Sequence, residues 1–378
     1  MKFEELAKKL KKEYDDDNYL QKANIVPGYQ RLQTQALGMD YALFGGLPLG
    51  RICVISGQQH SGKTTATFAQ ISAYQKAFPD KMCLFVDVEQ SADIQFQVNM
   101  NGVDTEKLTV LKPKVGQSGE QILADVLDFQ QNVDDIGMIV IDSIPALVPS
   151  ANLTNDFEKD NGRRGTIAGP LHKFCSNIVS SLREKNNILI FINQVRKVGT
   201  TYNGFPIFDE PGGDAPKYYS SVSIRFGTRK LIRLDEELSS SDSEGADGFK
   251  LLFKITKNKT ASCTRGGGFI SYRYETGMDT TRDLLEIATT FGFISKITSK
   301  TYALINCETG EILLDEDGNE LKGYKKTLIE YLNTHKEFKD KYLKMLTDFI
   351  SSSNTIKLLS KEEDEEIDKA NNGCSDTI

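Results

Sequence analysis

The chain has 378 residues, of which 39% are hydrophobic and 26% charged, and its formal net charge is −7 at pH 7. This length predicts two or three domains, and the apolar fraction excludes a chain that is disordered throughout. No apolar run approaches the roughly 18 residues that cross a bilayer, and the first residues are charged, so we expect a cytoplasmic protein. The six cysteines have no zinc-site spacing and indicate reduced core residues.

The N-terminal segment carries an amphipathic pattern. Residues 2–14 place Phe3, Leu6, Leu10 and Tyr14 at helical spacing, which predicts a helix. A helix this short is marginally stable alone, so its apolar stripe should pack on another surface. That surface is either the chain's own core or a neighbouring subunit, and the pattern leaves both open. We treat residues 1–29 as an N-terminal oligomerisation helix and linker.

Short apolar runs then alternate with longer helical stretches. Four of these runs are continuous, which predicts parallel strands covered on both faces: Ile52–Ile55, Cys83–Val86, Met138–Ile141 and Ile188–Ile192. Residues 222–226 and 269–274 instead alternate apolar and polar side chains, which predicts antiparallel strands with one solvated face. The fold class is therefore α/β, with a mostly parallel sheet and an antiparallel extension.

The C-terminal part has a different composition. Residues 279–350 predict a small α+β domain, with a hairpin near residues 308–310 and Lys-rich helices after it. Residues 315–318 resemble a calcium loop only superficially, because Leu313 occupies the first ligand position, and we predict a turn. Residues 351–378 are polar and end in a run of acids, so we expect a disordered acidic tail.

The strongest motif follows the first apolar strand. It reads Gly57-Gln58-Gln59-His60-Ser61-Gly62-Lys63-Thr64 and matches the phosphate-loop pattern G-x-x-x-x-G-K-[ST] between a strand and a helix. Its glycines let backbone N–H groups surround a phosphate, and the following helix N-terminus favours an anion. Lys63 can reach the β- and γ-phosphates, and the Thr64 hydroxyl can bind Mg²⁺. The motif therefore predicts a site for a nucleoside triphosphate with magnesium.

Three further residues lie at the ends of apolar strands. Asp142 ends the third strand and is the candidate second group at the metal. Glu89 follows the second strand, at the sheet edge where ligands bind, and is the candidate group that activates water. Gln194 ends the fourth strand, where an uncharged amide could sense a γ-phosphate without titrating.

Six segments, taken in order, resemble the RecA family of DNA strand-exchange recombinases. They are residues 45–51, 61–65, 85–89, 140–143, 191–196 and 257–259, within a resemblance that covers about residues 30–350. The resemblance implies a P-loop, RecA-like ATPase core at residues 30–278 with two DNA-binding loops, followed by the C-terminal domain. The short N-terminal helix and acidic tail are similar to the bacterial branch, and a phage- or plasmid-encoded relative is equally compatible.

The resemblance also implies roles for individual residues. Lys63, Glu89 and Gln194 would be catalytic, Gln194 by linking the ATP state to a DNA loop. Thr65 completes the phosphate loop, Asp93 would contact the adenine, and Phe96 would stack on it. Lys257 and Lys259 would reach the ATP of the adjacent subunit. The implied DNA-binding residues are Arg163, Arg164, Gly165, Arg196, Lys197, Gly199, Gly212 and Gly213.

The function implied is a DNA-dependent ATPase that uses ATP and Mg²⁺. It would polymerise on single-stranded DNA, also bind duplex DNA, and promote homologous pairing and strand exchange. Two alternatives stay open: a hexameric motor or helicase-like ATPase with the same core, and an ATP-switched DNA-binding module without strand exchange. Gln59 and His60 depart from the family loop, and the second DNA loop carries Asp209-Glu210. Residues 234–248 resemble a polar insertion, and the acidic tail is a hypothetical competitor for DNA-binding surfaces.

Overall fold

The computed structural model describes residues 3–15, 20, 28–153, 166–200, 206–233, 245–261, 265–306, 309–352, 358–359 and 361–372. Contacts within the chain group Met1–Gln30 into one unit and Arg31–Ile378 into a second. In the first unit, helix α1 (Phe3–Glu13) confirms the predicted helix, and none of its residues is buried. Phe3 and Leu6 are exposed on it.

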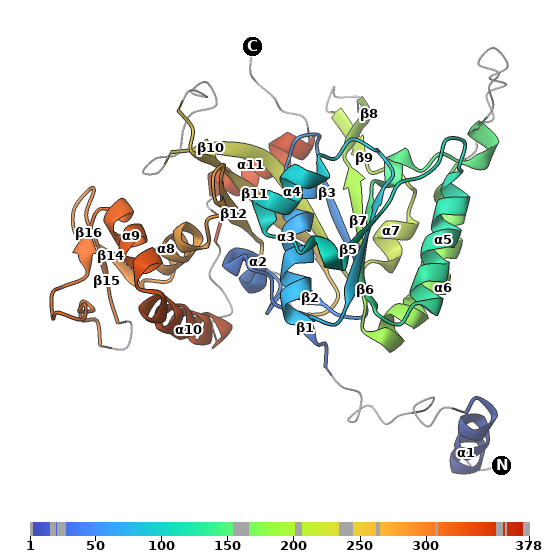
Figure 1. Cartoon of the computed structure of the whole chain (residues 1–378), viewed down its shortest axis with the longest axis horizontal. Coiled ribbons are helices and arrows are strands. Elements are labelled where there is room, and N and C mark those ends of the chain that lie inside the picture. The colour runs from blue at the N-terminus through green and yellow to red at the C-terminus, as the bar shows by residue number, and fades with distance from the viewer. Residues whose placement is uncertain are drawn as a thin grey trace. The chain divides into compact units, whose positions relative to one another are not determined.

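A nine-stranded sheet organises the second unit (Figure 1). Its order is β13-β12-β11-β10-β3-β7-β6-β4-β5, and the strands from β10 to β5 run parallel. The strands from β10 to β13 pair antiparallel. The strand bounds are β3 (Ile52–Gly57), β4 (Met82–Asp87), β5 (Leu108–Leu111), β6 (Ile136–Asp142), β7 (Ile188–Gln194), β10 (Val222–Ile232), β11 (Gly248–Asn258), β12 (Gly267–Arg273) and β13 (Gly277–Met278).

The four predicted parallel strands are confirmed as β3, β4, β6 and β7, each longer than its apolar run. The prediction for residues 222–226 was half right, because β10 pairs antiparallel with β11 on one side and parallel with β3 on the other. Residues 248–258 carried no prediction. They form β11, whose two faces contact different cores, so its sequence does not alternate cleanly.

Helices cover both faces of the parallel strands. One core joins α3 (Lys63–Ala77) and α4 (Ile94–Asn101) to strand residues such as Cys53 and Phe85. The other joins α5 (Gly119–Asn132) and α6 (Ala168–Lys185) to the intervening residues, such as Val54 and Leu84. Because successive strand side chains point to opposite faces, a continuous apolar run supplies both cores. The parallel arrangement predicted from these runs therefore has a physical basis.

The C-terminal region packs around a third core. It contains α8 (Thr280–Thr290), β14 (Ile294–Lys296), β15 (Tyr302–Leu304), β16 (Lys322–Gly323), α9 (Lys325–Thr334) and α10 (Lys336–Ser352). An antiparallel bridge between Ile305 and Ile312 flanks the predicted hairpin. Asp315 accepts hydrogen bonds from the N–H groups of Asp317 and Asn319, which confirms the predicted turn. This third core also includes Tyr41 from helix α2 (Leu37–Ala42), Leu252 from β11 and Phe269 from β12.

The prediction of a disordered tail was wrong for residues 361–372. They form helix α11 (Lys361–Asn372), which contacts β10 and β11. Ile367 is fully buried there, against Gly227. Lys230 pairs with Glu366 at 2.8 Å, and Lys254 pairs with Asp368 at 2.9 Å. The composition of this segment shows its acids, whereas the lysines that pair with them lie on strands distant in the sequence.

Residues 195–213 contain regular structure that their sequence did not predict. Strand β8 (Arg196–Thr200) pairs antiparallel with β9 (Pro206–Asp209), and residues 201–205 lie outside the described part of the chain. The hydrogen bonds between β8 and β9 join backbone groups, so the periodicity of the side chains does not reveal this pairing.

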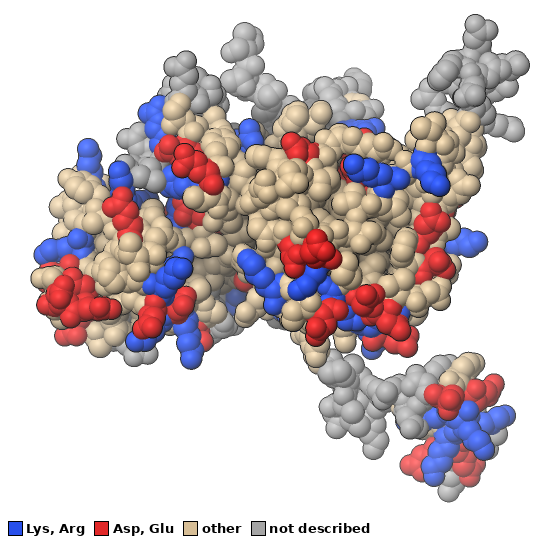
Figure 2. Space-filling view, viewed as in Figure 1, with Lys and Arg blue, Asp and Glu red and all other residues tan. Residues whose placement is uncertain are grey.

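On the face in Figure 2, basic and acidic side chains are interspersed. Among the described residues, no helix is long and apolar enough to span a membrane.

Candidate functional site

The phosphate loop connects the end of β3 to the start of α3, and two of its glycines have no room for a side chain. A Cβ atom at Gly57 would lie 2.7 Å from the carbonyl oxygen of Phe226. Gly62 has φ +80°, and a Cβ atom there would lie 2.5 Å from a methyl carbon of Leu251. The loop can therefore take this tight path only with glycine at both positions. This cradle fits a phosphate group.

Lys63 is the first residue of α3 and is only 8% exposed. Its Nζ donates a hydrogen bond to the carbonyl oxygen of Gln58 at 2.6 Å. Burial lowers the pKa of Lys63, while the negative charges of Asp142 and Glu89 act in the opposite direction. The site therefore brings one buried ammonium close to two carboxylates, and the ammonium is placed to bind phosphate oxygens.

Thr64, on α3, contacts Asp142, which is the last residue of β6. Thr64 Oγ1 donates a hydrogen bond to Asp142 Oδ2 at 2.8 Å. Burial raises the pKa of Asp142 to about 6, and the Thr64 hydrogen bond opposes that rise. A hydroxyl and a carboxylate are the hard oxygen donors that Mg²⁺ prefers. These residues therefore fit a magnesium ion bound together with a triphosphate.

Glu89 lies just past β4 and accepts hydrogen bonds from three side chains. Ser143 donates to Oε1, Gln194 Nε2 donates to the same oxygen at 2.8 Å, and Ser91 donates to Oε2 at 3.3 Å. The registers explain the meeting, because Asp87 is opposite Asp142, and Gly57 is opposite Gln194. The predicted catalytic residues thus converge at the carboxyl ends of β3, β4, β6 and β7.

Three residues at this edge were missed by the sequence analysis. Ser91 and Ser143 contact Glu89 directly. Asp87 is 2% exposed; burial raises its pKa, while the backbone N–H groups of Gln90 and Ser91 lower it. Asp87 and Ser143 lie within the motif segments and Ser91 lies two residues beyond one of them, but a serine hydroxyl or a buried acid shows its partner only in the folded chain.

The predicted adenine contacts lie together at the start of α4. Asp93 is the N-cap of this helix, and its carboxylate accepts a hydrogen bond from the backbone N–H of Phe96 at 3.0 Å. The Phe96 ring is 47% exposed. Asp93 therefore has a helix-capping role in the structure, and the exposed ring stays available for the predicted stacking.

Lys257 and Lys259 lie near the end of β11, far from the phosphate loop of their own chain. Asn258 pairs with Val222 of β10, and Val222 pairs with Cys53 near the start of β3. Gly57 of the phosphate loop lies at the other end of β3. Both ammonium groups donate hydrogen bonds to carbonyl groups of α7 (Ala215–Tyr219). Burial and the neighbouring charge of Lys259 lower the pKa of Lys257 to about 8. The two lysines occupy the opposite edge of the sheet from Lys63.

The predicted DNA-binding residues are only partly within the described chain. Arg163, Arg164 and Gly165 lie outside it. Arg196 is exposed and donates a hydrogen bond to Gln194 Oε1 at 3.3 Å. Lys197 and Gly199 belong to β8.

The two glycines predicted near the end of the second loop have a backbone role. Gly212 and Gly213 have φ values of +99° and +70°. A Cβ atom at Gly212 would lie 2.6 Å from Ile144. Both positions therefore require glycine for packing and for the path of the chain.

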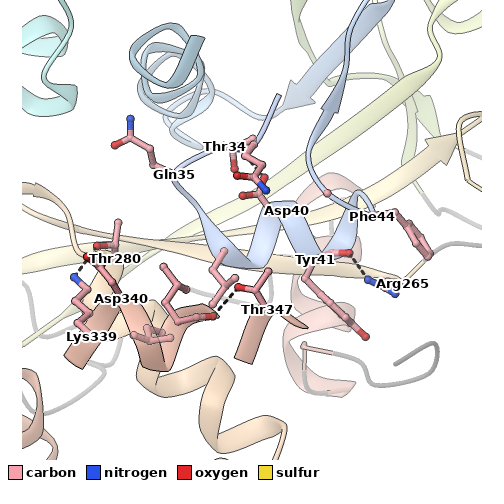
Figure 3. Close-up of a pocket in the computed structure, with 15 residues that line it drawn as sticks. Thr34, Gln35, Asp40, Tyr41, Phe44, Arg265, Thr280, Lys339, Asp340 and Thr347 are labelled. Carbon is pink, nitrogen blue, oxygen red and sulfur yellow. Dashed lines mark hydrogen bonds between the residues drawn. The ribbon is translucent and has the colours of Figure 1, made fainter. Parts of the chain in front are cut away.

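A separate cavity of about 520 Å³ lies between α2 (Leu37–Ala42), α8 and α10 (Figure 3). Asp40 lines it and accepts a hydrogen bond from the backbone N–H of Thr34 at 2.7 Å. Burial raises the pKa of Asp40 to about 7. None of the residues predicted for ATP or DNA lines this cavity, so it is distinct from the phosphate-loop site.

This chain is similar in sequence to known proteins. The family model for the RecA N-terminal domain matches residues 3–279. Protein RecA of Colwellia psychrerythraea is 29% identical over 350 residues, which are 92% of this chain and 91% of that protein. Protein RecA of Bdellovibrio bacteriovorus is 32% identical over 309 residues, which are 81% of this chain and 76% of that protein.

A solved structure, described as the crystal structure of the RadB recombinase, is 18% identical with a TM-score of 0.45. The match covers 65% of this chain and 98% of that chain. The family model spans well over half of the present sequence, including the phosphate loop, Glu89, Asp142 and Gln194. This chain belongs to the RecA family.

Proposed function

We propose that this chain is an ATP-dependent recombinase that forms filaments on single-stranded DNA and promotes homologous pairing and strand exchange. The observation that carries the ATPase part is the convergence of Lys63, Glu89 and the Thr64–Asp142 pair at one sheet edge. These groups suit phosphoryl transfer, in which catalysis depends on positioning and on neutralising charge.

Each residue has a defined role in the proposed hydrolysis. Lys63 would bind the β- and γ-phosphates, and Thr64 and Asp142 would hold Mg²⁺, which neutralises charge on the phosphates when bound. Glu89 would accept a proton from the attacking water while that water's oxygen bonds to the γ-phosphorus. The bond from the γ-phosphorus to the bridging oxygen breaks at the same time, giving ADP and inorganic phosphate.

A chain of hydrogen bonds supports DNA dependence. Arg196, on the predicted second DNA loop, donates to Gln194, and Gln194 donates to Glu89. A phosphate of DNA that binds Arg196 would compete for the guanidinium and alter the Gln194 amide. DNA binding would then change the hydrogen bonds of the catalytic carboxylate. The curated relatives named Protein RecA support the same assignment.

Two features support assembly into a filament. Helix α1 exposes Phe3 and Leu6, an apolar face suited to a neighbouring copy. Lys257 and Lys259 lie at the sheet edge opposite their own phosphate loop, so they suit contact with the ATP of the next subunit. Repetition of one such heterologous contact builds either a helical filament or a closed ring. A ring-forming motor is therefore the second candidate, and electron microscopy of the protein with ATP and DNA distinguishes the two.

The test of the proposed function is steady-state ATP hydrolysis with and without single-stranded DNA. We expect DNA to stimulate hydrolysis, and Glu89→Gln to reduce the rate by about 100-fold or more, as removal of a general base does. Strand exchange between homologous DNAs is then assayed directly. A rate of hydrolysis that DNA does not change would refute the hypothesis of a DNA-dependent ATPase. An active Glu89→Gln variant would refute the role of Glu89.

A further inference from the structure

Ser143 lies next to the proposed metal residue Asp142 and is completely buried, at 0% exposure. Its hydroxyl donates a hydrogen bond to Oε1 of Glu89. Within the described residues this is the one hydrogen bond of the hydroxyl: Ser143 is the N-cap of the short helix that follows it, but its side chain makes no capping hydrogen bond. A buried hydroxyl is thus dedicated to an exposed carboxylate.

The backbone ties the same two segments together. The N–H groups of Val88 and Glu89 donate hydrogen bonds to the carbonyl oxygen of Asp142, at 2.8 and 3.3 Å. Glu89 itself is exposed, so its side chain would otherwise sample several rotamers. The backbone bonds locate the Cα atom of Glu89, and the Ser143 hydrogen bond selects the position of its carboxylate.

The three donors to Glu89 differ in how firmly they are held. Gln194 is half-buried, and its amide oxygen accepts a hydrogen bond from the exposed Arg196 of the predicted DNA loop. Ser91 is exposed and lies 3.3 Å from Oε2, a long hydrogen bond. Ser143 has no exposed surface and directly follows β6, a strand whose seven residues are all buried. It is the donor least able to move.

We propose that Ser143 is a positioning residue for ATP hydrolysis: it holds the Glu89 carboxylate in place beside Asp142 and Lys63 when Gln194 turns away. This inference rests on the proposed role of Glu89 as the general base. Because Ser143 donates to Oε1, Oε2 carries only the long hydrogen bond from Ser91 and keeps a lone pair that can accept the hydrogen bond of the attacking water. Proton transfer requires the carboxylate within hydrogen-bond reach of that water. The rate of hydrolysis therefore falls when the carboxylate is free to take other positions.

The test compares Ser143→Ala with the unaltered full-length chain in steady-state ATP hydrolysis with single-stranded DNA. We expect kcat to fall by about tenfold, because positioning is lost and the base is kept. The KM for ATP, and the affinity for a non-hydrolysable ATP analogue, should change less than about twofold, because Lys63, Thr64 and Asp142 bind the nucleotide. Ser143→Thr keeps a hydroxyl and should recover most of the rate.

A double-mutant cycle separates positioning from a structural role. In the Glu89→Gln background, Ser143→Ala should cause no further loss, because groups that act as one unit are not additive. Ser72→Ala is the matched control, since Ser72 is also buried and its hydroxyl bonds to the carbonyl of Gly102, away from the site. It should leave kcat within about twofold.

The outcomes separate the inference from the proposed function. If Glu89→Gln keeps its activity, the proposed function fails. If Glu89→Gln is inactive while Ser143→Ala keeps its full kcat, only the inference fails. A rise in KM as large as the fall in kcat would assign Ser143 to folding and overturn the inference. A further fall in kcat when Ser143→Ala is added to Glu89→Gln would overturn it in the same way. A fall in the unfolding temperature of Ser143→Ala well beyond that of Ser72→Ala would count against it in the same way.

Discussion

Gly62 illustrates how a single residue sets the path of the phosphate loop. It adopts the left-handed conformation, and a Cβ atom there would also clash with Leu251 on β11. Gly102 adopts a similar conformation, with φ +61°, but has no atom within 4 Å of an added Cβ. The two glycines therefore share backbone strain and differ in steric contact.

We expect Gly62→Ala to cost about 2 kcal/mol or more of unfolding free energy and to weaken nucleotide binding at least tenfold. Gly102→Ala should cost about 1 kcal/mol and leave nucleotide affinity unchanged, because only the strain is introduced. Chemical denaturation and titration with a fluorescent ATP analogue measure the two effects. Equal effects of the two substitutions would show that the contact with Leu251 does not constrain the loop.

At the scale of elements, α11 covers lysines of β10 and β11 with its acids. Lys254 lies within ion-pair distance of Asp364 at 3.3 Å and of Asp368 at 2.9 Å. Lys250 is 3% exposed and pairs with Glu286 of α8 and Glu363 of α11. The acidic side chains of α11 thus form ion pairs with lysines that could otherwise contact the phosphates of DNA. The hypothesis that the tail competes with DNA gains a definite surface.

Deletion of residues 361–378 should tighten binding to duplex DNA by about three- to tenfold at low salt and reduce the requirement for magnesium. The reason is that lysines of β10 and β11 become available to displace counterions from DNA. Fluorescence anisotropy over a series of salt concentrations measures both the affinity and its salt slope. Duplex affinity that does not change would exclude competition by the tail.

A charge-matched pair of variants separates docking from net charge. Asp364→Asn with Asp368→Asn removes the partners of Lys254, whereas Glu362→Gln with Glu365→Gln removes two exposed acids. Among the described residues, Glu362 and Glu365 form no ion pair. Only the first pair should reproduce most of the effect of the deletion. Equal effects would assign the competition to overall charge.

At the scale of the whole molecule, the register of the sheet separates two halves of the proposed site. Lys63 lies at the carboxyl edge of the parallel strands, and Lys257 and Lys259 lie at the opposite edge. This separation supports the proposal that the two halves of one nucleotide site come from two chains. The proposal therefore predicts that hydrolysis requires two adjacent copies.

Mixing two inactive variants tests this requirement. Lys63→Ala and the double variant Lys257→Ala with Lys259→Ala should each lose DNA-stimulated hydrolysis. Their equimolar mixture should recover about a quarter of the normal rate, because random assembly gives that share of interfaces two intact halves. The variants assayed separately at the same total concentration are the controls. A mixture no more active than its components would argue against a site shared between subunits.

Buried acids predict how stability depends on pH. Asp283 on α8 is fully enclosed, and burial raises its pKa to about 7, while hydrogen bonds from Ser271 oppose the rise. The folded chain therefore binds a proton that the unfolded chain releases above about pH 4. This contribution to stability is complete below the unfolded pKa and is lost as pH rises through about 7.

We expect Asp283→Asn to reduce the loss of unfolding free energy between pH 5 and pH 7.5. Asparagine cannot ionise, so the part of the slope that belongs to residue 283 disappears. Urea denaturation at both pH values measures the difference, with exposed Asp128→Asn as the control. An unchanged slope in the Asp283→Asn variant would show that this carboxyl does not carry the pH dependence.

The phosphate loop, the four buried parallel strands and the strand-end positions of Glu89, Asp142 and Gln194 could all be predicted from the amino-acid sequence. These features are local: a glycine pattern, an apolar run and the residue that follows it can be read without knowing any distant contact. The strand ends also implied a common edge, since parallel strands present their carboxyl ends together.

Which side chains contact one another could be established only from the folded chain. Ser143 and Gln194 meet Glu89 across 54 and 105 residues of sequence, and Lys254 meets Asp368 across 114. Such contacts depend on strand order and register, which one-dimensional patterns do not encode. The docking of α11 and the opposite placement of Lys63 and Lys257 followed from that order. The chemical type of each site residue could be predicted from the sequence, whereas the residues that it contacts depend on the fold.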